Sequence, residues 1–354
     1  MFRLNPPLRL RALLRGLAVI LTAAAGAGPC AAGEPHIALL LPLDSATFAK
    51  HADAVRQGVL AAAKLRPEGA PPVRVYATAG EDAQTVAAYE RAVESGARLV
   101  LGPLTRRGVA ALAASGAVTV PTLALNQPER DLALPPRMYV LALNIESEVR
   151  QIAAVAMGAG RRRAAVIATD APLAQRTQRA FFTVWTQGGG TVVAEPRLPA
   201  DPAGLPRLHA AVAGADMAFL ALSGAQAGSL RAALDTGIAL YSTSDIHSGR
   251  PDPALARELT GIRFVDMPWR VSPLHPAVMV YPRPAFDDPD LDRLYALGID
   301  ALRAGERLVA APATLTLDGV TGLLRLGRDR VFARELTLAV FEGGAVRVLA
   351  EPVR

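Results

Sequence analysis

The stretch HIALLLPL, His36–Leu43, is the clearest structural signal in the sequence. It is an uninterrupted apolar run, which predicts a strand buried on both faces, and it leads into a predicted helix over about residues 45–64. The same strand-then-helix order recurs downstream, with strands predicted at 72–78, 97–103 and 118–126. Four such repeats favour an α/β fold in which a mainly parallel sheet is covered by helices on both faces.

The strand–helix rhythm restarts in the second half of the chain. Residues 134–144 form a predicted connector, after which a helix at 145–160 and a strand at 162–170 begin a second series. Two successive α/β halves of similar size predict two lobes with a cleft between them. The last part is β-rich, and Gly343–Gly344 is typical of a hairpin turn. The predicted division is a signal peptide at 1–33, a first lobe at 34–143 with a return segment at 261–315, and a second lobe at 144–260 with most of 316–354.

Composition points to a folded, exported protein. With 354 residues, 51% of them apolar, the chain is long enough for two cores and too apolar for low-complexity disorder. Arginines up to Arg15, an apolar segment at 16–28 and small residues around Ala32 predict a cleaved signal peptide and an exported mature protein. Four arginines and no acidic residue lie in residues 1–33, so the rest of the chain carries about +2 of the net charge of +6. So small an excess predicts no nucleic-acid partner. No later stretch approaches the roughly 20 apolar residues that span a bilayer.

The single cysteine, Cys30, lies at the predicted cleavage boundary. Bacterial lipoproteins are cut just before a cysteine that carries acyl chains, so lipidation of Cys30 and an outer-membrane anchor have to be considered. Pro29 immediately before the bond, with no leucine three places upstream, fits that pattern poorly and disfavours lipidation. If Cys30 is removed with the signal peptide, the mature protein has neither a disulfide nor a thiol nucleophile.

Polar residues follow several predicted strands at the point where a helix or loop begins. In open α/β sheets ligands bind at the carboxyl ends of strands, and helix N-termini there favour small anions or carboxylates. The same residue types are also ordinary helix caps, so each has a purely structural alternative. The candidates for lining a ligand cleft are Asp44, Ser45, Gly102, Thr105, Asn126, Gln127, Tyr241, Ser242, Thr243 and Asp266.

Catalytic and metal-binding motifs are missing from the sequence. It contains no Gly-x-Ser-x-Gly, no His-Glu-x-x-His and no phosphate-binding loop, and its five histidines are scattered without the spacing of metal ligands. A triad of Ser244, His247 and Asp266 assembled in space is the remaining catalytic alternative, although the segment containing His247 is equally typical of a polar loop. No cofactor, no metal and no enzymatic activity are predicted.

Several segments resemble a known family when they are taken in order. IALLLPL near the start and GP after the third strand are typical of the type I periplasmic-binding fold of branched-chain amino-acid receptors. More specific are VLGPLTRRGVAALA, VPTLALNQPE, YSTSDIHSGRPDPALARELTGIRFVDMPW, LYALGIDALR and LDGVTGLLRL, which are similar to the C-terminal domain of the penicillin-binding-protein activator lipoproteins. The resemblance extends over about residues 37–349.

This resemblance implies a two-lobed type I periplasmic-binding fold. It also implies a periplasmic protein that binds a class A penicillin-binding protein and stimulates peptidoglycan synthesis without performing chemistry itself. Larger members of the family carry an N-terminal helical-repeat domain, whereas here the predicted signal peptide leads directly into the first strand. Together with the poor lipoprotein pattern around Cys30, that departure weakens the expectation of docking at the outer membrane.

An activator needs a surface for its partner, and exposed aromatic and arginine side chains tend to supply the binding energy of such surfaces. Trp269, Arg270 and Tyr281 are the candidates of this type. The alternative for Trp269 is that it packs at the interface between the lobes.

The competing function is a solute receptor for amino acids or similar small molecules of an ABC transporter. Such a receptor must neutralise a carboxylate and an ammonium group, and hydroxyl and acidic residues such as Asp44, Ser45 and Asp245 could do so. Against this function, Arg106 and Gln127 place bulky side chains in loops where amino-acid receptors usually carry small hydroxyl residues.

Overall fold

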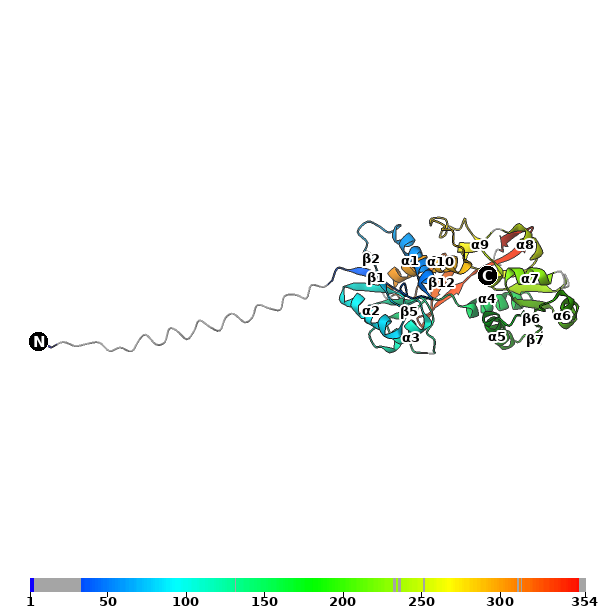
Figure 1. Cartoon of the computed structure of the whole chain (residues 1–354), viewed down its shortest axis with the longest axis horizontal. Helices are drawn as coiled ribbons and strands as arrows, with labels where there is room; N and C mark the ends of the chain where they lie inside the picture. The colour runs from blue at the N-terminus through cyan, green and yellow to red at the C-terminus, as the bar shows by residue number, and fades with distance from the viewer. Residues whose placement is uncertain are drawn as a thin grey trace.

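The computed structural model describes residues 1–2 and 33–349, apart from residues 131, 232, 233, 235, 236, 251, 311 and 313. Cys30 and nearly all of the predicted signal peptide therefore lie outside the described residues. In the described part the chain forms two α/β lobes side by side (Figure 1).

The first lobe contains a five-stranded parallel sheet in the order β2-β1-β3-β4-β5. Strand β1, which lies between β2 and β3, is buried along its whole length, and this confirms the prediction from HIALLLPL. The strands are β1 (His36–Leu41), β2 (Val73–Ala77), β3 (Ala97–Leu101), β4 (Thr122–Ala124) and β5 (Met138–Val140), and the helices that follow the first three are α1 (Ala49–Ala63), α2 (Asp82–Glu94) and α3 (Arg106–Ala114).

Strand β5 was predicted as part of a connector. It is only three residues long and follows Pro135 and Pro136, which resemble a turn in the sequence. Its strand character depends on pairing with β4, where Thr122 lies opposite Met138. Such a pairing is not visible in local periodicity.

The second lobe contains a seven-stranded sheet in the order β15-β14-β10-β9-β8-β6-β7. The pairs among β6 to β10 are parallel, whereas β14 and β15 form an antiparallel hairpin, as the Gly343–Gly344 pair predicted. Both glycines have positive φ angles, which a hairpin turn of this kind requires. The strands are β6 (Arg163–Ala168), β7 (Thr191–Ala194), β8 (Met217–Ala221), β9 (Ala239–Ser242), β10 (Arg263–Asp266), β14 (Thr337–Glu342) and β15 (Ala345–Val348).

Helices flank this second sheet, and short 3-10 turns interrupt the connections. The α-helices are α4 (Ile145–Gly158), α5 (Pro172–Gln187), α6 (Leu205–Val212), α7 (Gly224–Arg231) and α8 (Pro253–Glu258), and the 3-10 turns are η1 (Pro202–Gly204) and η2 (Ser244–Ile246).

The predicted return of the chain to the first lobe begins too early. Residues 261–315 were expected in the first lobe, but β10 pairs in parallel with β9 and antiparallel with β14, so it is a second-lobe strand. The short helix α9 (Pro268–Val271) follows β10, and the return itself is made by α10 (Pro289–Leu308), which packs along α1 (Figure 1).

A third, three-stranded antiparallel sheet belongs to neither large sheet. It consists of β11 (Thr316–Asp318), β12 (Leu323–Leu326) and β13 (Phe332–Glu335). An isolated bridge between Val140 and Val331 joins the segment before β13 to the edge of the first sheet. Of the predicted C-terminal segment 316–354, the structure describes residues up to 349, and within these only β14 and β15 extend the second-lobe sheet.

One cluster of buried apolar side chains extends through both lobes, and each lobe has a further cluster of its own. A single cluster of buried side chains runs from Leu39 in β1 through Leu297 in α10 to Phe219 in β8. The helices α1 and α10 meet at backbone distance, because a Cβ on Gly58 would lie 1.9 Å from the carbonyl oxygen of Tyr295. Gly298 has the reciprocal position, 2.2 Å from the carbonyl oxygen of Val55.

Replacing Gly58 with alanine should lower the free energy of unfolding by about 1–3 kcal/mol or more, because the added methyl group has no space between the two helices. Gly158→Ala in α4 is a matched control, since a Cβ there meets no atom within 4 Å. It should change stability by less than about 1 kcal/mol, in the stabilising direction. Urea unfolding of both variants makes the comparison, and equal stabilities would contradict the close helix contact.

Candidate functional site

The predicted cleft residues of the first lobe lie at helix starts and turns. The Thr105 hydroxyl accepts a hydrogen bond from the backbone N–H of Gly108 at 3.1 Å, so Thr105 is the N-cap of α3. Ser45 accepts the N–H of Phe48 at 3.3 Å in the turn before α1, and Asp44 beside it is exposed. The capping alternative is therefore confirmed for Thr105, and a ligand role at Asp44 and Ser45 stays a prediction.

Two further first-lobe candidates hold the loop after β4 against the loop after β3. The side-chain amide of Asn126 donates to the carbonyl of Leu104 at 3.0 Å, and its oxygen accepts the N–H of Gln127 at 2.9 Å. Gly102 has a φ of 117°, and a Cβ there would lie 2.1 Å from the carbonyl oxygen of Leu40. Gly102 is thus needed for the close approach of β3 to β1, while Gln127 remains half-buried.

The second-lobe candidates are packed inside the protein. Tyr241, Ser242 and Thr243 are all buried, so the prediction that they line an open cleft is wrong. The Ser242 hydroxyl donates to the carbonyl of Leu220 at 2.8 Å. The physical reason is that β9 is an interior strand of the sheet, between β8 and β10, and is covered on both faces.

Asp266 is a buried anchor at the carboxyl end of β10. Its carboxylate accepts hydrogen bonds from His247 Nδ1 at 2.9 Å, from Arg270 Nε at 3.2 Å and from the N–H of Met267 at 2.8 Å. Burial opposes ionisation, but the hydrogen bond from His247 and the positive charges of Arg293 and Arg270 outweigh it and lower the pKa of Asp266. The carboxylate is thus occupied within the protein, which argues against the predicted ligand role.

Trp269 and Arg270 are also buried, so the prediction that they form a partner surface is wrong. The Trp269 indole N–H donates to Asp292 at 2.7 Å, its ring lies 5.4 Å from that of Tyr295, and the Arg283 guanidinium lies 4.4 Å from its centre. The packing alternative is confirmed, because Asp292 and Tyr295 belong to α10.

Arg270 connects the turn after η2 to the start of α10. Its guanidinium donates to the carbonyls of His247 at 2.6 Å and Pro289 at 3.0 Å. Gly249, with a φ of 75°, lies directly against it, since a Cβ there would be 2.5 Å from Nη2. The third candidate, Tyr281, is half-buried against the core, and burial raises the pKa of its hydroxyl.

A second set of buried charges, absent from the sequence-based candidates, joins α4, β13 and α10. Glu148 accepts the N–H of Ser244 at 3.0 Å and lies 3.6 Å from the guanidinium of Arg334, while Arg293 donates to the carbonyl of Ser244 at 2.8 Å. Burial raises the pKa of Glu148, although Arg334 and the Ser244 N–H oppose the shift. Burial lowers the pKa of Arg334, and among the residues that the structure describes its Nε and Nη2 have no hydrogen-bond partner.

The helical periodicity of α4 gives a weak indication of one of these buried charges, Glu148. Glu148 lies on the apolar face of α4, where Val149, Ile152 and Ala153 are buried. A charged residue on such a face indicates a buried pair. The partner could not be identified, because Arg334 is 186 positions away in the chain.

The catalytic alternative is not supported by the geometry. His247 and Asp266 do form a pair, but in the described part of the chain no hydrogen bond joins the Ser244 hydroxyl to His247. Ser244 instead uses its backbone N–H and carbonyl to bind Glu148 and Arg293. The residues that the structure describes contain no group of three or more His, Cys, Asp or Glu side chains placed to hold a metal ion.

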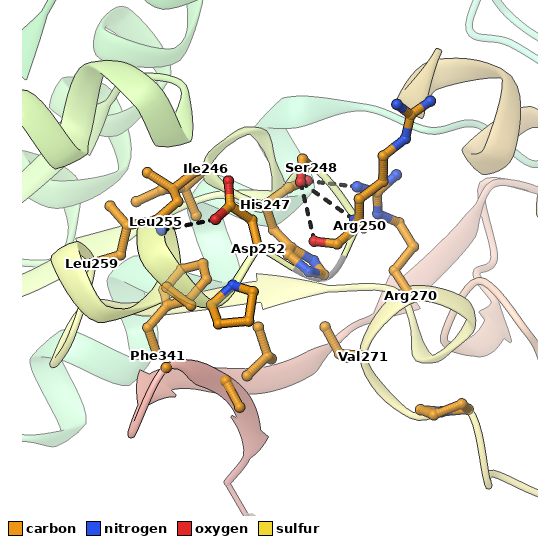
Figure 2. Close-up of a pocket in the computed structure, with 17 residues that line it drawn as sticks. Ile246, His247, Ser248, Arg250, Asp252, Leu255, Leu259, Arg270, Val271 and Phe341 are labelled. Atoms are coloured by element: carbon orange, nitrogen blue, oxygen red, sulfur yellow. Dashed lines mark hydrogen bonds between the residues drawn. The ribbon is translucent and has the colours of Figure 1, made fainter. Parts of the chain in front are cut away.

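Cavities border this network on more than one side. One of about 370 Å³ lies beside His247 and Arg270 in the second lobe (Figure 2). Another of about 510 Å³ lies between the lobes and is lined by Gln127, Ser147, Arg150 and Arg334, among others. Gln127 is the predicted cleft residue that lines this second cavity. Within the described residues no helix is long and apolar enough to cross a membrane.

Solved structures share this architecture. The C-domain of LpoA from Haemophilus influenzae, described as a regulator of PBP1A, has a TM-score of 0.73 at 21% identity, over 89% of this chain and 100% of that domain. A structure described as a "putative branched-chain amino acid ABC transporter" from Chromobacterium violaceum has a TM-score of 0.76 at 40% identity, over 86% of this chain and 99% of that one. The protein therefore has the two-lobed type I periplasmic-binding fold.

The family follows from the sequence match. The family described as "LppC putative lipoprotein" matches residues 34–344, and the chain belongs to that family. The penicillin-binding protein activator LpoA of Pantoea ananatis is 28% identical over 324 residues, which cover 77% of this chain and 47% of that protein. LpoA of Edwardsiella piscicida is 27% identical over 323 residues, with 77% and 46% covered. The chain thus spans about half the length of the curated relatives it matches.

Replacing Asp266 with asparagine should lower the free energy of unfolding at neutral pH by about 3–5 kcal/mol, because Arg270 loses its nearer carboxylate inside the protein. The folded-state pKa of Asp266 lies below the ordinary value of 3.8, so its stabilisation is present above that value and is lost as the pH falls through the folded-state pKa. The difference between wild type and variant should therefore narrow on acidification from about pH 5 to about pH 3.

The control for this variant is Asp170→Asn, which removes an exposed carboxylate and should change stability by no more than about 0.5 kcal/mol. Urea unfolding at several pH values measures both variants. A difference for Asp266→Asn that is small at neutral pH, or that widens in acid, would contradict the anchoring role of the carboxylate.

Proposed function

We propose that the protein is a non-catalytic activator of peptidoglycan synthesis that acts by binding a class A penicillin-binding protein. The observation that carries this proposal is the match to the whole C-domain of LpoA, a regulator of PBP1A, together with curated relatives that are named penicillin-binding protein activators. The His247–Asp266 pair is used in packing against Arg270, and within the described residues no hydrogen bond joins a serine hydroxyl to His247, which supports a binding role over catalysis.

The proposed place of action is the periplasm. The predicted signal peptide at 1–33 and the lipoprotein description of the family both support export to the cell envelope. A form anchored to a membrane would carry its acyl chains on Cys30.

The loop Ser272–Arg283 is the surface that we propose for the partner. Leu274, Met279 and Val280 are 84%, 63% and 55% exposed, an unusual concentration of large apolar side chains on one loop. The loop is held in shape by Val278, which is buried and whose N–H donates to the carbonyl of His275 at 2.8 Å.

The base of this loop is fixed to Trp269 in α9 and to Tyr295 in α10. Arg283 donates to the carbonyl of Trp269 at 2.6 Å, and the Tyr295 hydroxyl donates to the carbonyl of Pro282 at 3.0 Å. An apolar surface that is ordered before binding loses little conformational entropy when a partner covers it. The loop begins two residues after Arg270. The surface that we propose therefore lies a few residues further along the chain than the predicted candidates Trp269 and Arg270.

The test is the affinity of the purified protein for a purified class A penicillin-binding protein, measured by biolayer interferometry. The double variant Met279→Ser/Val280→Ser should bind about tenfold more weakly, because it removes apolar contact area from the proposed surface. The matched control is Leu65→Ser/Val309→Ser, which changes two residues that are 56% and 52% exposed near the ends of α1 and α10. It should bind like the wild type.

Two outcomes separate the claims. If the wild-type protein binds no class A penicillin-binding protein, the proposed function is wrong. If the wild type binds and both double variants bind equally well, the function stands and the loop is not the contact surface.

A solute receptor is the second candidate, because the structure that is 40% identical is described as a "putative branched-chain amino acid ABC transporter". Four of the hydroxyl groups predicted to bind an amino acid are not exposed for that role in this structure, since Thr105 caps a helix and Tyr241, Ser242 and Thr243 are buried. We expect no common amino acid at millimolar concentration to raise the melting temperature of the purified protein. A clear rise with any of them would favour the receptor function.

A further inference from the structure

The cavity between the lobes is formed where three segments of the chain meet. Its walls come from the loop after β4, from the first half of α4, and from β13 together with the turn before it, and its volume is about 510 Å³. That size is in the range of sites for small molecules. Of the residues predicted to line a ligand cleft, only Gln127 lies in this wall, so most of the cavity was not anticipated from the sequence.

Two side-chain amides in the wall, those of Asn144 and Gln127, have groups free to bind a ligand. The Oδ1 atom of Asn144 accepts the N–H of Ser147 at 2.8 Å, and because a backbone N–H can only donate, this contact fixes which end of the amide carries the oxygen. In the part of the chain that the structure describes, the NH2 group of Asn144 has no hydrogen-bond partner, and neither has the side-chain amide of Gln127. Both residues are half-buried, so the cavity has two free NH2 donors and one free amide oxygen.

Arg150 and Asp329 add one charge of each sign to the same wall. Arg150 lies on α4 and Asp329 in the turn before β13, and both residues are exposed. Among the described residues the guanidinium of Arg150 has no hydrogen bond and no ion pair. The carboxylate of Asp329 uses Oδ1 to accept the N–H of Val331 at 3.2 Å, and its Oδ2 is free within the same residues.

The other charged residues of the wall are already paired. Glu335 binds Arg325 at 2.5 Å, and the buried guanidinium of Arg334 lies 3.6 Å from Glu148, so neither is available to a ligand. The first turn of α4 carries Glu146 and Glu148, which offset the positive end of the helix dipole. With one free charge of each sign, the cavity favours neither an anion nor a cation.

Hydroxyl and acetamido groups match this set of free side chains. A hydroxyl group donates and accepts at once, so it can accept from the guanidinium of Arg150 while it or a neighbouring hydroxyl donates to Asp329. Both contacts are hydrogen bonds to a charged group, which are stronger than those between neutral groups. The C=O and N–H of an acetamido group are complementary to the NH2 and C=O of a side-chain amide such as that of Gln127.

We propose that the cavity between the lobes binds a neutral oligosaccharide that carries acetamido groups. Its hydroxyl groups contact Arg150 and Asp329, and one acetamido group contacts the side-chain amides of Gln127 and Asn144. The site selects an acetylated sugar over the same sugar without acetamido groups, because the two amides are otherwise left without partners in a half-buried wall.

The glycan strands of peptidoglycan consist of acetamido sugars. A site of this kind lets an activator of peptidoglycan synthesis contact the polymer as well as the enzyme that makes it, and this biological role rests on the proposed function. The binding of the sugar itself does not, because it is argued from the side chains of the cavity alone.

The experiment uses N,N′-diacetylchitobiose as the probe and the full mature chain as the protein. Titration calorimetry should give saturable binding at millimolar concentration or better, and cellobiose, which has hydroxyl groups in place of the acetamido groups, should bind at least about tenfold more weakly. Arg150→Ala should weaken binding of the probe by about tenfold and Gln127→Ala by about fivefold, since each removes hydrogen bonds to the sugar. Ala333→Trp, which adds a bulky side chain at an exposed position of the wall on β13, should abolish binding.

Matched controls carry the same changes elsewhere. Arg91→Ala changes an exposed arginine of α2, and Ala77→Trp changes an exposed strand position in β2, at the edge of the first sheet opposite β5. Both should bind the probe like the wild type. The proposal is overturned if the wild type does not bind diacetylchitobiose, if cellobiose binds equally well, or if Arg150→Ala and Ala333→Trp retain full binding.

Affinity for the class A penicillin-binding protein is measured separately and without sugar. Loss of that affinity with intact sugar binding overturns the proposed function alone, and the reverse result overturns the sugar site alone.

Discussion

The carboxylate of Asp266 is the interaction on which the surrounding structure depends. It ends β10, accepts the N–H that begins the turn into α9, and holds His247 and Arg270 together in a buried region. A buried carboxylate is costly unless it is paired and hydrogen-bonded, and here three donors satisfy it. Because α9 starts at this point, the side chain of Trp269 packs against α10. This contact attaches the second lobe to α10, the helix that returns to the first lobe.

The same attachment supports the loop that we propose as the partner surface. The exposed loop after α9 is held at its base by Arg283 against Trp269, and the cavity on the other side is bounded by His247 and Arg270. The residues that resembled a site in the sequence, Asp266, Trp269 and Arg270, are thus the buried support beneath this loop. A rigid support of this kind limits the conformational entropy lost on binding.

The lobes are connected by charge as well as by packing. Glu148, Arg293 and Arg334 come from α4, α10 and β13 and meet around the backbone of Ser244. Buried groups of this type add little net stability, but they penalise any arrangement in which one of them loses its partner. They therefore specify how the three elements are placed, which is consistent with a protein that presents a fixed surface.

The sequence by itself determined the alternation of strands and helices, the two-lobed fold and the family, because these depend on local periodicity and on motifs that lie close together in the chain. It also placed the β14–β15 hairpin, whose turn needs glycine. Only the tertiary structure decided that β5 is a strand, that β10 belongs to the second lobe, and that Trp269, Arg270 and Asp266 are buried. The reason is that burial and strand pairing depend on residues far away in the chain: Asp292 covers Trp269, and β14 pairs with β10 after some 70 intervening residues.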